Sequence, residues 1–298
     1  MPITEKAEPK SSIEMNPFHE EVKFIQVEPD VSLGVVESGS GRPIVILPGW
    51  SQTADQWKEY VADFSSAHRV LAMDMRGHGR SSKPAYGYRI SRLAADLQAV
   101  LASENLEDVT LIGHSMGCAV IWSYLEMFRS SKIRNLILID QTPAIVSVPN
   151  AFASAETMLG SIFTAEEALQ IIQGLRGPEA AGLTSSLLAS MTSNVFPEGD
   201  FQWLLAQNLL MPREHAASLL YDHVFKDWTD VIQRIDVPTL VIGAEGSIFP
   251  WRAMTAVGQM IRGSETFIFD AKDGGSHFAF LENPTKLIHV MTDFLQRL

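Results

Sequence analysis

Short apolar runs alternate with amphipathic stretches along most of this chain, and that alternation constrains its fold more than any other feature. Runs typical of strands occupy residues 22–27, 31–37, 43–47, 69–73, 109–112, 133–140, 239–243 and 266–270. Between them, residues 90–102 and 284–298 repeat apolar side chains with the 3.6-residue period of a helix. Strands separated by helices predict a mostly parallel sheet flanked by helices, the α/β class. The first two strands, joined by a Pro29-Asp30 turn, are expected to be antiparallel.

Residues 142–228 interrupt this alternation. They contain helical segments punctuated by glycines and prolines but no convincing strand. We interpret them as a helical cap inserted between two strands, over the carboxyl ends of the sheet. The length of 298 residues allows about two domains at roughly 150 residues each. The pattern instead predicts one core, residues 22–141 and 229–298, with the cap at 142–228 and a disordered or extended lead-in at 1–21.

Charge and cysteine content exclude several classes of partner. The chain has 35 acidic and 23 basic residues, a formal net charge of −12, and no basic run. Nucleic acid binding needs clustered Lys and Arg, so it is not expected. No apolar run approaches the roughly 18 residues that span a membrane. Cys118 is the single cysteine and the lead-in lacks an apolar signal region, which favours a cytoplasmic protein. The expected partner is a small-molecule substrate, and a homodimer is compatible with the sequence.

The segment Gly113-His114-Ser115-Met116-Gly117 follows an apolar run and precedes a helical one. Gly-x-Ser-x-Gly at a sharp strand-to-helix turn exposes the serine hydroxyl at the start of a helix, where amide groups favour developing negative charge. Ser115 is therefore the candidate nucleophile. The alternative is an ordinary turn that carries no chemistry.

A nucleophilic serine needs a base and a site that stabilises an oxyanion. His277 follows a predicted strand and a Gly-rich loop, so it is the candidate base; the alternative is a surface loop histidine. Trp50 follows the strand at 43–47, and its backbone N–H can converge with that of Met116 on a substrate oxygen. His114 is expected to be structural.

These motifs, in this order, resemble the α/β-hydrolase fold superfamily. The resemblance is carried by Leu47-Pro48-Gly49-Trp50, Asp74-Met75-Arg76-Gly77-His78-Gly79-Arg80-Ser81, Gly113-His114-Ser115-Met116-Gly117 and Gly275-Ser276-His277-Phe278. It covers residues 22–298 apart from the helical insertion. One departure is Pro48, which stands where many members have His. This departure is not expected to matter, because backbone amides bind the oxyanion at this position.

The acid that orients the histidine is the second departure. Members usually place an Asp in the loop after the strand at 239–243, where this chain has Gly246, with Glu245 one residue earlier. Other members use an acid about 25 residues after the serine, and Asp140 lies 140 − 115 = 25 residues after Ser115. Asp140 is the preferred candidate, and Glu245 stays open.

The resemblance implies a serine hydrolase that cleaves an ester or lactone of a mostly apolar small molecule. A serine at the elbow, where related families carry Asp, argues against dehalogenase and epoxide-hydrolase chemistry. The alternatives are a cofactor-free dioxygenase of a hydroxylated heteroaromatic, a cofactor-free haloperoxidase or perhydrolase, and a non-catalytic receptor. No cofactor or metal is expected, because the chain lacks a phosphate-binding loop, a His-Glu-x-x-His motif and a dinucleotide fingerprint. A minority of the cap's apolar side chains should face the site, from the set Phe152, Met158, Phe163, Met191, Phe196, Trp203, Leu204, Met211 and Trp228.

Overall fold

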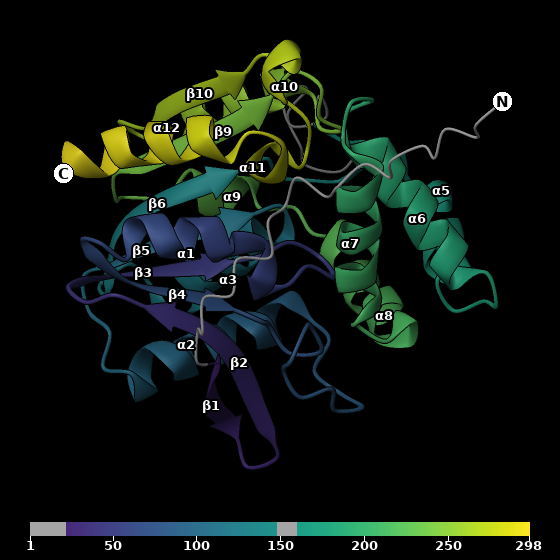
Figure 1. Cartoon of the computed structure of the whole chain (residues 1–298), viewed down its shortest axis with the longest axis horizontal. Helices are drawn as coiled ribbons and strands as arrows, with labels where there is room; N and C mark the ends of the chain where they lie inside the picture. The colour runs from purple at the N-terminus through teal and green to yellow at the C-terminus, as the bar shows by residue number, and fades with distance from the viewer. Residues whose placement is uncertain (1–21, 148–159) are drawn as a thin grey trace, which may run out of the picture.

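The computed structural model describes residues 22–147 and 160–298. Its centre is an eight-stranded sheet with the order β1-β2-β4-β3-β5-β6-β9-β10 (Figure 1). The strands are β1 (Val22–Glu28), β2 (Val31–Ser38), β3 (Arg42–Leu47), β4 (His68–Met73), β5 (Val109–His114), β6 (Ile133–Ile139), β9 (Thr239–Ala244) and β10 (Glu265–Phe269). β1–β2 and β2–β4 pair antiparallel, and all other neighbours in this sheet are parallel.

The predicted α/β class and mostly parallel sheet are confirmed. Each strand of the sheet lies within two residues of its predicted position, and the apolar runs of the central strands become buried between two helical layers. The predicted helices at 90–102 and 284–298 correspond to α2 (Ile90–Ser103) and α12 (Pro284–Gln296). Within the described residues, no helix is long and apolar enough to cross a membrane.

Helices cover both faces of the sheet because neighbouring residues of a strand point to opposite sides. Val45 and Leu47 of β3 share a core with one group of helices, and Ile44 and Ile46 share a core with the other. The first group is α2, α3 (Met116–Phe128), α9 (Thr229–Ile232) and α10 (Trp251–Met260). The second is α1 (Lys58–Phe64), α11 (Ala279–Glu282) and α12, with the 3-10 turn η1 (Ala54–Trp57) beside α1. A second short turn, η2 (Ala271–Asp273), follows β10.

In the described part of the chain, four helices lie between β6 and α9, and we call residues 160–228 the helical insertion. They are α5 (Ala165–Gly174), α6 (Ala180–Met191), α7 (Glu198–Leu209) and α8 (Arg213–Val224), gathered at one side of the sheet (Figure 1). The expectation that this region lacks strands is wrong in one detail. β7 (Val146–Ser147) and β8 (Phe163–Thr164) form a two-residue parallel pair, too short to leave a period in the sequence. The predicted lead-in at 1–21 lies outside the described residues.

The sheet register aligns the loops that carry the candidate site residues. Leu47 of β3 pairs with Gly113 of β5, and His114 pairs with Ile139 of β6. Trp50, Ser115 and Asp140 therefore all follow strand ends at one edge of the sheet. Parallel strands place their ligand sites at this carboxyl edge.

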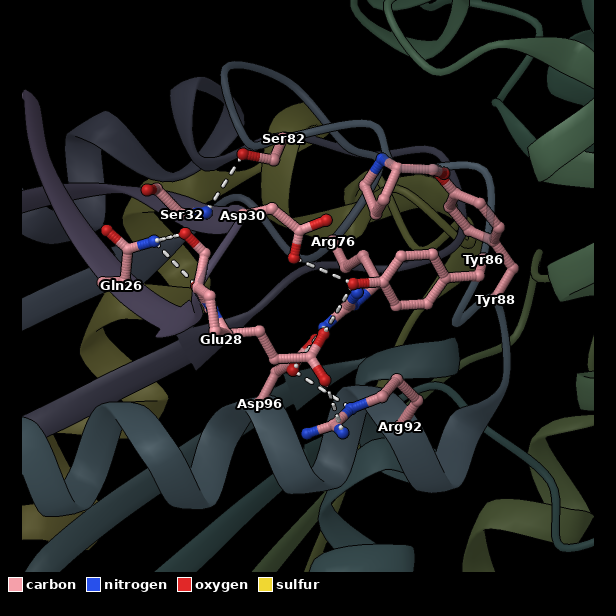
Figure 2. A network of polar contacts seen from close by, with 12 residues as sticks. Gln26, Glu28, Asp30, Ser32, Arg76, Ser82, Tyr86, Tyr88, Arg92 and Asp96 are labelled. Atoms are coloured by element: carbon pink, nitrogen blue, oxygen red, sulfur yellow. Dashed lines mark hydrogen bonds and ion pairs between the residues drawn. The ribbon is translucent and has the colours of Figure 1, made fainter.

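A buried ion-pair network braces the turn end of the β1–β2 hairpin (Figure 2). Arg76, which is fully buried, donates to both carboxylate oxygens of Asp96 on α2 at 2.8 and 2.9 Å. Arg76 also forms an ion pair with Glu28 at the end of β1, at 2.5 Å. Arg92 forms further ion pairs with both Glu28 and Asp96. Such a bidentate pair fixes geometry as well as charge. The network therefore ties the β1–β2 hairpin to α2.

Candidate active site

The turn at Ser115 has the backbone strain expected of an exposed nucleophile. Ser115 has φ 52° and ψ −126°, a conformation that a non-glycine residue rarely adopts, and α3 begins at the next residue. Its N–H donates to Ile139 O at 2.8 Å, so the strained turn is held against β6. A Cβ at position 117 would lie 2.0 Å from Leu47 O, which explains why that position is glycine. Because β3 approaches so closely, the last residue of the Gly-x-Ser-x-Gly motif must be glycine.

His277 and Asp140 form a buried pair. The two residues are 3% and 2% exposed, and His277 Nδ1 lies 2.7 Å from Asp140 Oδ2. Since an ionised carboxylate only accepts hydrogen bonds, Nδ1 carries the proton, and Nε2 of the neutral ring is left as a base. Burial raises the pKa of Asp140, against the opposing effect of its hydrogen bonds from His277 and Ser247. The pair has the geometry by which an acid fixes the tautomer of a histidine base.

Ser247 is a neighbour of this pair that the sequence did not single out. Its hydroxyl donates to Asp140 Oδ2, the same oxygen that faces His277. Ser247 follows β9 in the loop where the superfamily usually carries its acid. Only the tertiary contact between this loop and the end of β6 identifies it, so no local signal was available.

Glu245, the other candidate acid, lies elsewhere. Its side chain is exposed, and its Oε2 accepts a hydrogen bond from Ala271 N at 3.3 Å. Its own N–H continues the pairing with β10 by donating to Phe269 O. The structure therefore brings Asp140, and not Glu245, into contact with His277.

Trp50 and Met116, the predicted oxyanion donors, follow the ends of the adjacent strands β3 and β5. Met116 is the first residue of α3, so its N–H has no partner within the helix. Trp50 is joined to the helical insertion through its indole: Nε1 donates to Ala216 O on α8 at 2.9 Å, and the Arg213 guanidinium lies 5.7 Å from its ring centre. The side chain of Trp50 thus connects its own loop to α8.

His114, expected to be structural, links three segments of the site. Its ring is fully buried; Nε2 lies 2.8 Å from His277 O, and Nδ1 lies 3.0 Å from Gln52 Oε1. Gln52 Oε1 also accepts from Gly49 N at 2.9 Å. The residue beside the nucleophile therefore spans from the loop of Trp50 to the loop of His277. Gln52 was missed, because only its tertiary position gives it this contact.

One cavity brings the predicted residues together with the helical insertion. Ser115, His277 and Trp50 line it. Most of the remaining lining is apolar, and comes from the insertion and from the loop after β9: Ile162, Phe163, Leu187, Leu188, Met191, Leu220, Val224, Ile248 and Phe249. Of the apolar residues expected there, Phe163 and Met191 line the cavity, whereas Leu204, Met211 and Trp228 are buried in cores. Phe152 and Met158 lie outside the described residues.

The part of the chain that the structure describes contains no group of three or more His, Cys, Asp or Glu side chains arranged to hold a metal ion.

The chain is similar to known proteins that share one fold. The family described as alpha/beta hydrolase fold matches residues 42–170. A non-heme chloroperoxidase from Kitasatospora aureofaciens is 27% identical over 252 residues, 80% of this chain and 86% of its own. The crystal structure of a bromoperoxidase from Bacillus anthracis superposes with a TM-score of 0.83 at 17% identity, covering 93% of this chain and all of that one. An esterase from Exiguobacterium antarcticum gives the same TM-score at 22% identity, with coverage of 93% and 100%.

The sheet order, the elbow after β5 and these matches agree. The chain has the α/β-hydrolase fold, as the motifs in its sequence predicted.

Proposed function

We propose that this protein is a serine hydrolase that cleaves a carboxylic ester or lactone of a mostly apolar small molecule through an acyl-enzyme. The observation that carries the proposal is one constellation: a strained serine lining the same cavity as a histidine whose Nδ1 is paired with a buried carboxylate. A nucleophile, a base and a group that orients the base are the parts that acyl transfer needs.

In the first step, His277 Nε2 takes the hydroxyl proton of Ser115 as Oγ attacks the substrate carbonyl carbon. The resulting imidazolium is stabilised by Asp140 through the Nδ1–H bond. Collapse of the tetrahedral intermediate breaks the bond to the leaving oxygen, and His277 returns the proton to that oxygen. The product alcohol leaves, and the acyl group remains on Ser115; in a lactone the alcohol stays attached to that acyl group.

The negative charge of the intermediate needs donors at the carbonyl oxygen. We assign these to the backbone N–H groups of Trp50 and Met116, at the ends of β3 and β5. Removing one such donor typically costs about 3–4 kcal/mol of transition-state stabilisation. Because the donors are backbone groups, their placement depends on the loop and on the helix start rather than on the side chains.

Water then attacks the acyl-enzyme, with His277 again as the base, and Ser115 is released. The apolar lining of the cavity favours a neutral, mostly apolar acyl or alcohol group. A small-molecule substrate, with neither nucleic acid nor membrane as a partner, is part of the proposal.

The experiment is turnover of a panel of simple esters and lactones by the purified protein and by Ser115→Ala. We expect p-nitrophenyl butyrate or a small lactone to be hydrolysed, and the Ser115→Ala rate to fall by at least about 10³-fold. Cys118→Ser is the control, because Cys118 is buried three residues further along α3 and its pKa is raised by burial. Undiminished turnover by Ser115→Ala would contradict the mechanism.

A second candidate, perhydrolysis, is favoured by the similarity to a non-heme chloroperoxidase. The same acyl-enzyme, formed from a carboxylic acid with loss of water, would pass its acyl group to hydrogen peroxide and release a peracid that oxidises halide. Bromination of a dye in acetate and peroxide, lost in Ser115→Ala, would support it. A bromination rate far below the ester hydrolysis rate would leave hydrolysis as the main activity.

A further inference from the structure

Two polar side chains interrupt the apolar lining that the helical insertion gives to the cavity. Asn208, near the end of α7, is 1% exposed, and His223, near the end of α8, is 5% exposed. Both line the same cavity as Ser115 and His277. Neither takes part in the chemistry proposed above.

The side-chain amide of Asn208 is half satisfied. Its Nδ2 donates to Leu204 O one turn earlier in α7, at 2.9 Å. Its Oδ1 has no hydrogen-bond partner among the described residues. Exchanging the two amide atoms would place two acceptors against each other, so the unpartnered atom is the oxygen. What it lacks is a hydrogen-bond donor.

His223 is unsatisfied in the same way. Its Nδ1 is buried and has no partner among the described residues. Burial lowers the pKa of His223 to about 3, so the ring is neutral at physiological pH and has one donor and one acceptor nitrogen. In the tautomer with the proton on Nδ1, the missing partner is a hydrogen-bond acceptor.

Buried polar groups are almost always paired, because an unpaired one loses its bonds to water without replacement. The apolar neighbours in the cavity cannot supply a donor to Asn208 Oδ1 or a partner to His223 Nδ1. Because both residues line the cavity, a molecule bound there is the candidate source of the missing partners. A hydroxyl group has one hydrogen and can also accept, so it can donate to Asn208 Oδ1 while accepting from the Nδ1–H tautomer of His223.

We propose that Asn208 and His223 form a polar subsite that binds a hydroxyl group of the substrate, so that the preferred substrates are hydroxylated esters or lactones. This inference rests on the proposed hydrolase function. It deepens that function by proposing that residues of the helical insertion determine which of several similar apolar esters is preferred.

The test compares matched ester pairs. Methyl 3-hydroxybutanoate and the methyl esters of meta- and para-hydroxyphenylpropanoic acid are each assayed against the corresponding O-methyl ether. We expect at least one hydroxy ester to have a kcat/KM about 10-fold above its ether, since an ether cannot donate to Asn208 Oδ1. Asn208→Leu should reduce that ratio to about 1. His223→Phe should also lower the ratio, and it serves as a second variant should Asn208→Leu fold poorly.

Asn135 provides a matched control. It is also 1% exposed with an unpartnered Oδ1, but it lies in β6 and does not line the cavity. Asn135→Leu should leave the hydroxy-to-ether ratio unchanged. Ester turnover with no preference for any hydroxy ester, or a preference that survives both Asn208→Leu and His223→Phe, would overturn the inference alone. Absence of all ester turnover would overturn the proposed function and the inference with it.

Discussion

Replacing Asp140 with asparagine tests the pairing at the centre of the site with almost no change of shape. Asp140 Oδ2 accepts from both His277 Nδ1 and Ser247 Oγ. If the amide oxygen of asparagine faces His277, the imidazolium formed during the reaction loses its negative partner. If the amide NH₂ faces it, the proton must move to Nε2 and the base is lost. Either arrangement disables the histidine, and in enzymes with this arrangement the loss is about 10⁴-fold in kcat, or about 5.4 kcal/mol at 1.36 kcal/mol per decade.

The same substitution should not weaken the fold at neutral pH. Burial raises the pKa of Asp140 in the native state above its unfolded value of 3.8. At a pH between the unfolded and native pKa, the native state therefore holds a proton that the unfolded chain has released. That contribution to stability is present below about pH 3.8 and is lost as the pH rises through the raised pKa. The ionised carboxylate therefore does not stabilise the folded state at pH 7. We expect the free energy of unfolding of Asp140→Asn, from urea titration, to equal or exceed that of the parent.

The assay is steady-state hydrolysis of the best ester found, at pH 7 and pH 8, with Glu245→Gln as the control. Because the Glu245 side chain is exposed and contacts Ala271 N, its variant should stay within about twofold of the parent. A loss below tenfold for Asp140→Asn, or a loss of orders of magnitude for Glu245→Gln, would refute the reasoning.

Three further predictions concern stability. Gly117→Ala should fold poorly or lose more than about 3 kcal/mol of unfolding free energy, because its Cβ would collide with Leu47 O. Gly182→Ala, which has open space around it in α6, should gain up to about 1 kcal/mol. Thermal unfolding of both variants tests the two values. Arg76→Gln should cost about 3–5 kcal/mol in urea unfolding by leaving Asp96 buried without its main partner, and a loss under 1 kcal/mol would contradict this. Burial lowers the pKa of His223 to about 3, so the unfolded chain binds the proton between pH 6.5 and 3 while the native state does not. Stability should fall on acidification in that window by up to about 1.4 kcal/mol per pH unit, and His223→Phe should flatten the slope.

The sequence predicts the sheet well because its central strands are short apolar runs that are buried only inside the sheet. The elbow was predictable for a related reason: glycine at position 117 and serine at 115 follow a buried strand, and parallel strands collect their carboxyl ends at one edge. The acid was ambiguous because Asp140 and Glu245 both follow strands that become neighbours in the sheet. Side-chain direction after the strand end separates them, and local pattern does not contain that information.

The contacts that the sequence did not indicate all join segments far apart in the chain. Ser247 meets Asp140 across 107 residues, and His114 meets the carbonyl of His277 across 163. Asn208 and His223 look in the sequence like polar residues on helix surfaces. Only the packing of α7 and α8 over the cavity makes them buried and unpaired.

The most direct test of the central claim is covalent labelling with a fluorophosphonate, which phosphonylates a serine only when a neighbouring base activates it. Peptide mapping by mass spectrometry should find the label on Ser115, with labelling lost in Ser115→Ala and strongly slowed in Asp140→Asn and in His277→Gln. No label on the folded protein, or a label on another residue that persists in Ser115→Ala, would contradict the assignment of Ser115, His277 and Asp140 as a catalytic unit.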